Sequence, residues 1–263
     1  MPLAPGAALV TGAGRRIGRD LALFLGELGW DVALHCVTST EGAEAAAQAL
    51  RERGRRAAVL RADLLSEAET AALLPRAAEA LGAPITLLVN NASIFEHDDL
   101  ASATRESWDR HLGSNLRAPF VLTQALAARA PAAGEDEAGL PQATALVVNM
   151  IDQRVWKPTP EFMTYSLAKA GLWWFTRTAA QALAPRVRVC GIGPGPTLQG
   201  DRQSAAHFER QRGATPLERG SSLADIRAGL AFLLAADGYT GQMLALDGGQ
   251  HLAWRTADVL GVE

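Results

Sequence analysis

The sequence has 263 residues and a mass of 27.8 kDa, with 48% hydrophobic and 20% charged residues, a balance that is typical of a globular protein and excludes a disordered chain. Its 25 basic and 28 acidic residues give a net charge of −3, so neither nucleic acid nor an anionic membrane is expected as a partner. Cys36 and Cys190 are the only cysteines, which argues against a disulfide scaffold and a four-cysteine zinc site.

Short apolar segments recur along the chain, and a helical pattern follows most of them. They are rich in Val, Leu and Ala and show little strict alternation, as strands of a parallel sheet buried on both faces do. In chain order the predicted strands are residues 7–11, 31–36, 57–62, 85–91, 144–151, 187–191 and 243–247. The alternation predicts an α/β fold: a doubly wound, Rossmann-like parallel sheet of about seven strands with helices on both faces.

Helix signals lie between these strands. Ile17, Leu21 and Leu25 fall on one helix face after the first strand, and Ser66 with Glu69 fits a capping box. Later helices are predicted at 104–129, 162–183 and 223–235. The length admits one large domain or two small ones, but no strong linker divides the chain. We therefore expect a single domain over residues 1–263, with residues 131–142 as a solvated loop.

The first predicted strand runs into a glycine-rich turn that opens the first helix. Gly12, Gly14 and Gly18 have the spacing G-x-G-x-x-x-G, one residue longer than the common dinucleotide-binding fingerprint. Glycines at this place let a pyrophosphate approach the backbone at a helix N-terminus. The turn therefore predicts a dinucleotide site, the alternative being an ordinary glycine-rich turn.

The end of the second strand bears on which dinucleotide is bound. NAD-binding proteins usually carry a carboxylate there for the ribose 2′-hydroxyl, and residues 34–39 contain none. Arg15 and Arg16 lie in the glycine turn, and a guanidinium pairs well with a phosphate. We therefore predict NADPH, with Arg16 as the main contact of the 2′-phosphate and Ser39 and His35 as helpers. For Arg15 a solvated surface charge is the alternative.

Tyr165 and Lys169 form the clearest pair of chemically active side chains. Four residues apart on a predicted helix, they share one face and can serve one site. The ordinary pKa of a phenol is about 10, and a nearby ammonium lowers it. A single Tyr-x-x-x-Lys match is common by chance, so the pair needs support from other motifs.

That support comes from motifs that occur in a fixed order. With the glycine turn, Asn90-Asn91-Ala92-Ser93, Asn115 and Pro194-Gly195, the chain resembles the short-chain dehydrogenase/reductase family over almost its whole length. The resemblance implies one domain, a nicotinamide cofactor and catalytic positions at Asn115, Tyr165 and Lys169. The residues expected at the cofactor are Gly12, Gly14, Arg15, Arg16, Ile17, Gly18, His35, Ser39, Asp63, Leu64, Asn91, Ala92, Ser93, Tyr165, Lys169, Pro194, Gly195 and Thr197.

One departure from that family pattern is informative. The family usually has a serine thirteen residues before the tyrosine, and here that position is Asp152. In this the chain resembles the pteridine reductase branch, whose bacterial relatives reduce dihydropterins and dihydrofolate. The resemblance places Ser93, Phe95, Asp152 and Tyr165 at the substrate, with Phe95 as a platform for a flat ring. For Asp152 the alternative is a helix-capping or surface carboxylate, and for Phe95 ordinary packing.

An aspartate beside the tyrosine makes chemical sense in a reductase. Because like charges repel, a carboxylate next to Tyr165 opposes phenolate formation and keeps the phenol protonated. We expect Asp152, Tyr165 and Lys169 to relay a proton to the substrate as Asn115 supports the site. Such general-acid help contributes about 10²–10⁴-fold to a rate.

These observations predict a cytoplasmic, NADPH-dependent reductase of a dihydropterin or related pteridine. The alternatives are a short-chain reductase of another carbonyl or imine and, more remotely, a non-catalytic dinucleotide sensor. A substrate loop is expected at about 196–216. No histidines have the spacing of a metal site, and no apolar stretch reaches the ~20 residues that span a membrane. The family's tetramers, together with the aromatic run 172–175, suggest a homotetramer.

Overall fold

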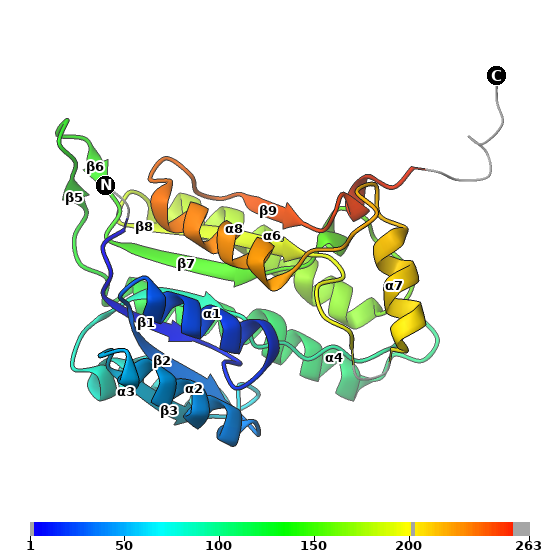
Figure 1. Cartoon of the computed structure of the whole chain (residues 1–263), viewed down its shortest axis with the longest axis horizontal. Coiled ribbons are helices and arrows are strands. Elements are labelled where there is room, and N and C mark those ends of the chain that lie inside the picture. The colour runs from blue at the N-terminus through cyan, green and yellow to red at the C-terminus, as the bar shows by residue number, and fades with distance from the viewer. Residues whose placement is uncertain (1–2, 201–202, 255–263) are drawn as a thin grey trace.

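A seven-stranded parallel sheet forms the centre of the molecule (Figure 1), in a computed structural model that describes residues 3–200 and 203–254. The strand order is β3-β2-β1-β4-β7-β8-β9. The strands are β1 (Ala7–Val10), β2 (Asp31–Cys36), β3 (Ala57–Arg61), β4 (Ile85–Asn90), β7 (Ala145–Met150), β8 (Val187–Pro194) and β9 (Met243–Leu246). The predicted single-domain, doubly wound α/β fold is confirmed.

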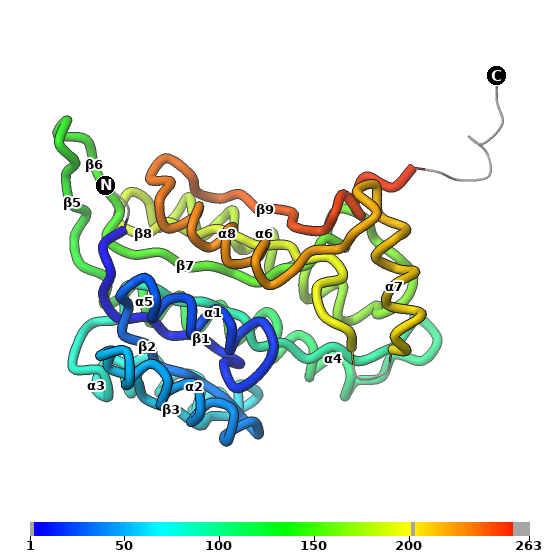
Figure 2. Tube along the Cα trace, viewed as in Figure 1, coloured from blue at the N-terminus to red at the C-terminus, as the bar shows by residue number. Residues whose placement is uncertain are grey.

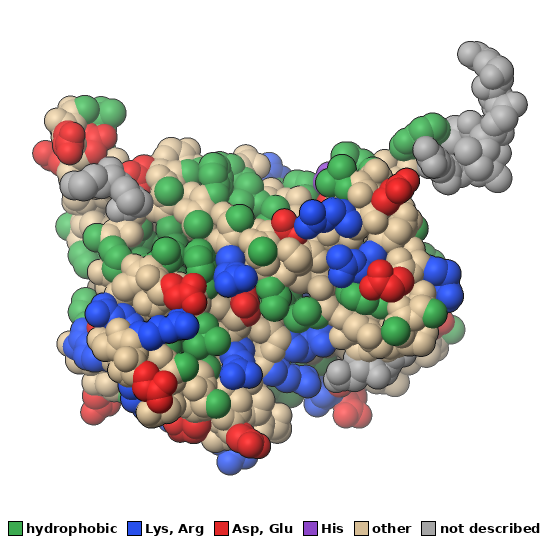
Figure 3. All heavy atoms as spheres, in the orientation of Figure 1, with side chains coloured by type: hydrophobic (Ala, Val, Ile, Leu, Met, Phe, Trp, Pro, Cys, Tyr) green, Lys and Arg blue, Asp and Glu red, His purple; other side chains and the backbone are tan. Residues whose placement is uncertain are grey.

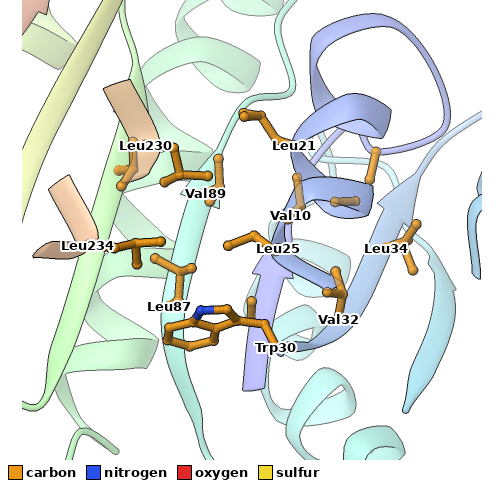
Figure 4. Packing of buried hydrophobic residues seen from close by; sticks show 14 of the residues in the cluster. Val10, Leu21, Leu25, Trp30, Val32, Leu34, Leu87, Val89, Leu230 and Leu234 are labelled. Atoms are coloured by element: carbon orange, nitrogen blue, oxygen red, sulfur yellow. The ribbon is translucent and has the colours of Figure 1, made fainter. Parts of the chain in front are cut away.

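Helices cover both faces of this sheet. One layer is α1 (Arg16–Glu27), α2 (Thr40–Glu52) and α8 (Leu223–Ala235); the other is α3 (Glu67–Leu81), α5 (Ala118–Ala127) and α6 (Met163–Leu183). Figure 4 shows Leu21 and Leu25 of α1 and Leu230 of α8 packed on Val10 and Val89 of the sheet. The strands are buried on both faces because each face has its own helix layer. No helix among the described residues is long and apolar enough to cross a membrane.

Three local features differ from the sequence prediction. The expected loop 131–142 contains a two-stranded hairpin, β5 (Gly134–Glu135) and β6 (Pro141–Gln142), whose strands are too short to leave a pattern. The expected helix 104–129 is α4 (Arg105–Leu112), a π-helical turn η1 (Gly113–Arg117) and α5. The expected substrate loop contains α7 (Ala205–Gly213), which carries Phe208 as its one buried residue.

The strand order reverses at β1, which pairs with β2 on one side and with β4 on the other. In doubly wound sheets, ligands bind at the carboxyl ends of the strands beside such a reversal. The arrow of β7 points to the end of the molecule where α4 and α7 lie (Figure 1; the same end is seen in the trace of Figure 2), and β4 runs parallel to β7. The loops that follow β1, β4, β7 and β8 therefore meet there and bring the predicted site residues together.

Arg188 lies near the start of β8, at the end of the sheet opposite to the predicted site. Its side chain is buried, and its Nη1 donates to the carbonyls of Leu233, Ala236 and Tyr239 at distances of 2.8, 3.0 and 3.3 Å. These carbonyls lie at and beyond the end of α8, where helix carbonyls lack partners and a cation is favoured. One arginine on β8 thus holds the end of α8 on the sheet.

We expect Arg188→Met to lower the free energy of unfolding by about 2–4 kcal/mol, because one buried and two partly buried carbonyls lose a charged donor. Urea denaturation measures this. Arg186→Met, two residues earlier and partly exposed, is the control and should cost less than about 0.5 kcal/mol. Equal costs for the two variants would contradict the role of Arg188.

Candidate active site

The glycine turn lies between β1 and α1 and is folded tightly against the end of β4. Gly12 has a φ of +65°, and a Cβ at this position would lie 2.9 Å from the Cα of Ala92. Cβ atoms at Gly14 and Gly18 would collide with Ser39 and with Asn91. The backbone at the start of α1 is therefore bare of side chains at all three glycines. Such a cradle fits the pyrophosphate of a dinucleotide.

Asn91 and Ala92 complete this cradle from the end of β4. The side-chain amide of Asn91 donates to the carbonyls of Thr11 and Gly12, and the backbone N–H groups of Asn91 and Ala92 donate to the Thr11 hydroxyl at 2.9 Å. Both predicted cofactor residues thus hold the shape of the turn. Ser93, next in the chain, is exposed at the mouth of the site.

His35 lies under the turn, not beside a 2′-phosphate as predicted. Its side chain is fully buried, its Nδ1 accepts the N–H of Gly12 at 3.2 Å, and its Nε2 lies 3.0 Å from the carbonyl of Ala62. These contacts occupy both ring nitrogens and define a neutral imidazole that donates from Nε2. Burial lowers the pKa of His35, which favours the same neutral form. His35 supports the cradle from below.

Arg16, predicted to contact the 2′-phosphate, binds backbone carbonyls in this structure. Its guanidinium donates to the carbonyls of Leu198 and Gln199, at 3.1 and 2.7 Å, in the loop that follows β8. The residue is held at φ +53°, a left-handed conformation that costs a non-glycine residue about 1–3 kcal/mol. In this structure Arg16 therefore ties the glycine turn to the predicted substrate loop. Figure 3 shows basic side chains gathered over the start of α1, where Arg15 and Arg16 are both exposed.

The remaining predicted cofactor residues line the same end of the sheet. Asp63 is exposed after β3, and its carboxylate accepts the N–H of Leu65; Leu64 is buried in the core. Gly195 packs so closely on Asp247 that a Cβ would lie 2.7 Å from the Asp247 Cα. The hydroxyl of Thr197 contacts the hydroxyl of Ser221 and donates to the carbonyl of Gly195. The other members of the predicted set are Ile17, at the start of α1, and Pro194, at the end of β8.

The structure brings Tyr165 and Asp152 together. Asp152 follows β7, Tyr165 lies in the first turn of α6, and the Tyr165 hydroxyl donates to Asp152 Oδ2 at 2.7 Å. Burial and the charge of Asp152 raise the pKa of Tyr165 well above its ordinary value of 10.0. Burial also raises the pKa of Asp152, although its bonds from Arg154 N–H and Tyr165 oppose this. The pair therefore holds its proton strongly.

Lys169 lies one helical turn below Tyr165 and is 2% exposed. Its ammonium donates to the carbonyl of Met150 at 2.7 Å and lies 5.7 Å from the centre of the Tyr165 ring. No hydrogen bond joins it to Asp152 or to the Tyr165 hydroxyl, so its link to the predicted relay is electrostatic. Burial lowers the pKa of Lys169 to about 8, and the charge of Asp152 opposes that fall.

Asn115 acts on a neighbouring loop. It sits in the π-helical turn η1, and its side-chain amide accepts the N–H of Ile94 at 2.9 Å and donates to the Ile94 carbonyl at 2.8 Å. π-Helical turns are rare and are often found at functional sites. Its side chain thus fixes the residue that precedes Phe95.

Phe95 lies in an aromatic cluster at the mouth of the site. Its ring stacks on Phe162 with centroids 4.3 Å apart and meets Tyr165 edge-on at 4.7 Å. The guanidinium of Arg154 lies 4.9 Å from the centre of the Phe162 ring. Sequence reasoning missed Phe162 and Arg154, because neither stands in a recognised motif. It missed Asp98, Thr164 and His111 too, which are described below.

Comparison with known proteins agrees with this geometry. The chain belongs to the short-chain dehydrogenase family, whose model matches residues 6–209. Among solved structures, FolM alternative dihydrofolate reductase 1 from Brucella canis, complexed with NADP, is 42% identical, with a TM-score of 0.88 over 99% of this chain and 100% of that chain. A blue fluorescent protein from a metagenomic library, in complex with NADPH, is 30% identical with a TM-score of 0.81 over 95% and 99%. A putative ketoacyl reductase of granaticin synthesis from Streptomyces violaceoruber is 33% identical over 95% of this chain and 98% of its own.

Lys157 and Lys169 are the only lysines of the sequence, so the ionisation of Lys169 can be observed directly. With ¹³C-labelled lysine, we expect one ε-carbon signal to titrate near pH 8, and Lys157→Arg identifies it by elimination. In Asp152→Asn the midpoint should fall further, because the carboxylate that raises this pKa is gone. An unchanged midpoint in Asp152→Asn would show that the two groups are not coupled.

Proposed function

We propose that this protein is an NADPH-dependent reductase that reduces the C=N bond of a dihydropterin or a related pteridine. The observation that carries the proposal is the 2.7 Å contact between the Tyr165 hydroxyl and Asp152, in a site where burial raises the pKa of both groups. The likeness to FolM alternative dihydrofolate reductase 1 supports a pteridine as the substrate class.

Reduction of a C=N bond needs a hydride on carbon and a proton on nitrogen. Bound NADPH supplies the hydride. Tyr165 supplies the proton from its hydroxyl, and the phenolate oxygen is reprotonated by Asp152, which regains its proton from solvent. When Asp152 is protonated, the direction of the 2.7 Å bond reverses, and the Tyr165 O–H is released to face the substrate nitrogen. Burial raises the pKa of Asp152 and so makes its protonated form easier to reach than that of an exposed carboxyl.

NADPH as the cofactor rests on this chain's own residues. The bare turn of Gly12, Gly14 and Gly18 fits the pyrophosphate, and β2 ends at Cys36 with no carboxylate to repel a 2′-phosphate. Exposed arginines at the start of α1 supply positive charge beside it. Relatives crystallised with NADP or NADPH support the same choice.

The substrate site lies beside the aromatic cluster. Phe95 is 44% exposed and borders the Tyr165 ring, so a flat heterocycle can reach both. Stacking on such a ring is worth about 0.5–1.5 kcal/mol beyond burial. Residues 196–216, which include α7, form the substrate loop, and Arg16 joins its start to the cofactor turn.

We also propose a cytoplasmic homotetramer. In the layer of α3, α5 and α6, Phe120 of α5 and Leu167 and Trp174 of α6 are exposed, and Trp174 is 65% exposed. Large apolar side chains of this kind are enriched in subunit interfaces. A second copy of this chain is the partner that would bury them.

Asp152→Ser should lower kcat for dihydrobiopterin with NADPH by about 10²-fold or more, because the tyrosine loses its proton source. Tyr165→Phe should lower it at least as much. Activity of the unmodified protein should fall as pH rises, because the relay needs protons on Tyr165 and Asp152, and the raised pKa values of both groups move that fall to higher pH. NADPH consumption followed at 340 nm measures all three. Full activity of Asp152→Ser would contradict the relay.

A substrate panel separates the proposal from its alternative. Turnover of dihydropterin but not of simple ketones or imines supports a pteridine reductase. Turnover of ketones alone would leave a short-chain reductase of another carbonyl, the kind of activity named for the granaticin relative. Binding of NADPH with no turnover of any substrate would instead support a dinucleotide sensor.

The role of Arg16 is tested by comparing cofactors. If Arg16 binds the 2′-phosphate, Arg16→Ala should raise the Kd for NADPH by about 10-fold or more and leave the Kd for NADH unchanged. If it ties the substrate loop, as its bonds to Leu198 and Gln199 indicate, Arg16→Ala should raise KM for the pterin with both cofactors alike. We expect the second result. Arg15→Ala is the matched control from the same turn.

A further inference from the structure

The helix that carries Tyr165 begins without a cap of its own. Phe162, the residue before α6, is held at φ +57°, and its side chain caps nothing. The first N–H groups of the helix bond instead to Asp98, which lies in the loop between β4 and α4. The Met163 N–H donates to the Asp98 carbonyl at 3.2 Å, and the Thr164 N–H donates to Asp98 Oδ1 at 3.1 Å. A carboxylate at a helix N-terminus also interacts favourably with the helix dipole.

Asp98, which forms this cap, is the last acceptor in a chain of hydrogen bonds through three buried side chains. The Thr164 hydroxyl donates to Asp98 Oδ2 at 2.5 Å, and His111 Nδ1 lies 2.7 Å from the same hydroxyl. His111 Nε2 accepts the N–H of Glu96 at 3.1 Å, so the ring proton must be on Nδ1 and must point to Thr164. Asp98, Thr164 and His111 are 3%, 2% and 0% exposed.

The charge states agree with these directions. Burial lowers the pKa of His111 and favours the neutral ring. Burial alone would raise the pKa of Asp98, but the two bonds from Thr164, a bond from the Ser107 side chain and the nearby His111 together lower it. A neutral imidazole, a hydroxyl and a carboxylate therefore form one chain in which every donor has an acceptor.

This chain joins the two halves of the proposed site. Thr164 directly precedes Tyr165, and Glu96 and Asp98 follow Phe95 in the loop after β4. The His111 ring also meets the Tyr165 ring edge-on, with centroids 6.1 Å apart. A shift of Thr164 would thus move the Tyr165 hydroxyl relative to Asp152 and the Phe95 ring relative to Tyr165.

We propose that Asp98, Thr164 and His111 are positioning residues that fix Tyr165 against Asp152 and beside Phe95, a role that rests on the proposed function for its kinetic consequence. None of the three need touch the substrate. They hold the proton donor where its bond to Asp152 forms, and they couple the loop that carries Phe95 to the start of α6.

Thr164→Val and Thr164→Ser form the matched pair for a test. Valine keeps the shape but leaves His111 Nδ1–H and Asp98 Oδ2 without the hydroxyl, whereas serine retains it. We expect Thr164→Val to lower kcat for dihydropterin by about 10–100-fold, the size of effect that a small misplacement of a catalytic group produces. Thr164→Ser should stay within about 2-fold, and the Kd for NADPH should change by less than about 2-fold in both variants.

A second readout needs no substrate. Tyr165 and Tyr239 are the only tyrosines, so ¹⁹F NMR of protein labelled with 3-fluorotyrosine gives two signals, and Tyr239→Phe identifies that of Tyr165. Fluorination brings the titration of the phenol into a milder pH range. In Thr164→Val the Tyr165 midpoint should fall, because the phenol moves away from the carboxylate that raises its pKa; in Thr164→Ser it should not.

The two readouts distinguish two kinds of failure. If the unmodified protein does not reduce pterins but the Tyr165 midpoint falls only in Thr164→Val, the positioning network stands and the proposed substrate is wrong. If pterins are reduced but Thr164→Val matches Thr164→Ser in kcat and in the Tyr165 midpoint, the network has no positioning role. Should Thr164→Val fail to fold, Asp98→Asn tests the same cap, because asparagine has one acceptor oxygen where Asp98 has two, so either the hydroxyl or the N–H of Thr164 loses its acceptor.

Discussion

The hydrogen bond between Tyr165 and Asp152 is the interaction on which the rest of the site depends. A carboxylate taken out of water is costly unless donors satisfy it. Asp152 has the N–H of Arg154 on one oxygen and the Tyr165 hydroxyl on the other, so neither partner can be removed without exposing the other to that cost. This hydrogen bond requires the end of β7 and the start of α6 to stay close enough for the side chains of Asp152 and Tyr165 to meet.

Several parts of the fold meet that requirement. Lys169, one turn along α6, bonds to the carbonyl of Met150 at the end of β7 and so fixes the helix to the strand. Asn90 and Asn149 join β4 to β7 through their side chains at 2.8 Å, and Asn149 continues to Thr176 of α6. The buried polar groups of this region thus serve the placement of α6 as much as the chemistry.

Most of the fold was predictable because buried parallel strands and amphipathic helices leave periodic patterns. The site was predictable where a residue type stands in a fixed motif, as with Tyr165, Lys169 and the glycine turn. The contacts of His35 and Arg16 were not, because sequence shows which residue follows a strand but not which way its side chain points. The cap by Asp98 was also hidden, since it joins residues 66 positions apart through a neighbouring loop. The helix α7 has a single buried residue and therefore leaves no amphipathic stripe.

The imidazole of His35 gives the cofactor cradle a chemical weak point. Its Nδ1 must stay unprotonated to accept the Gly12 N–H, and burial lowers its pKa below the ordinary 6.5. The unfolded chain therefore binds this proton more readily than the native one, so the stability contributed by His35 is present above pH 6.5 and declines as the pH falls through the lower native value. Acidification thus removes the support beneath Gly12 and loosens the dinucleotide end of the molecule.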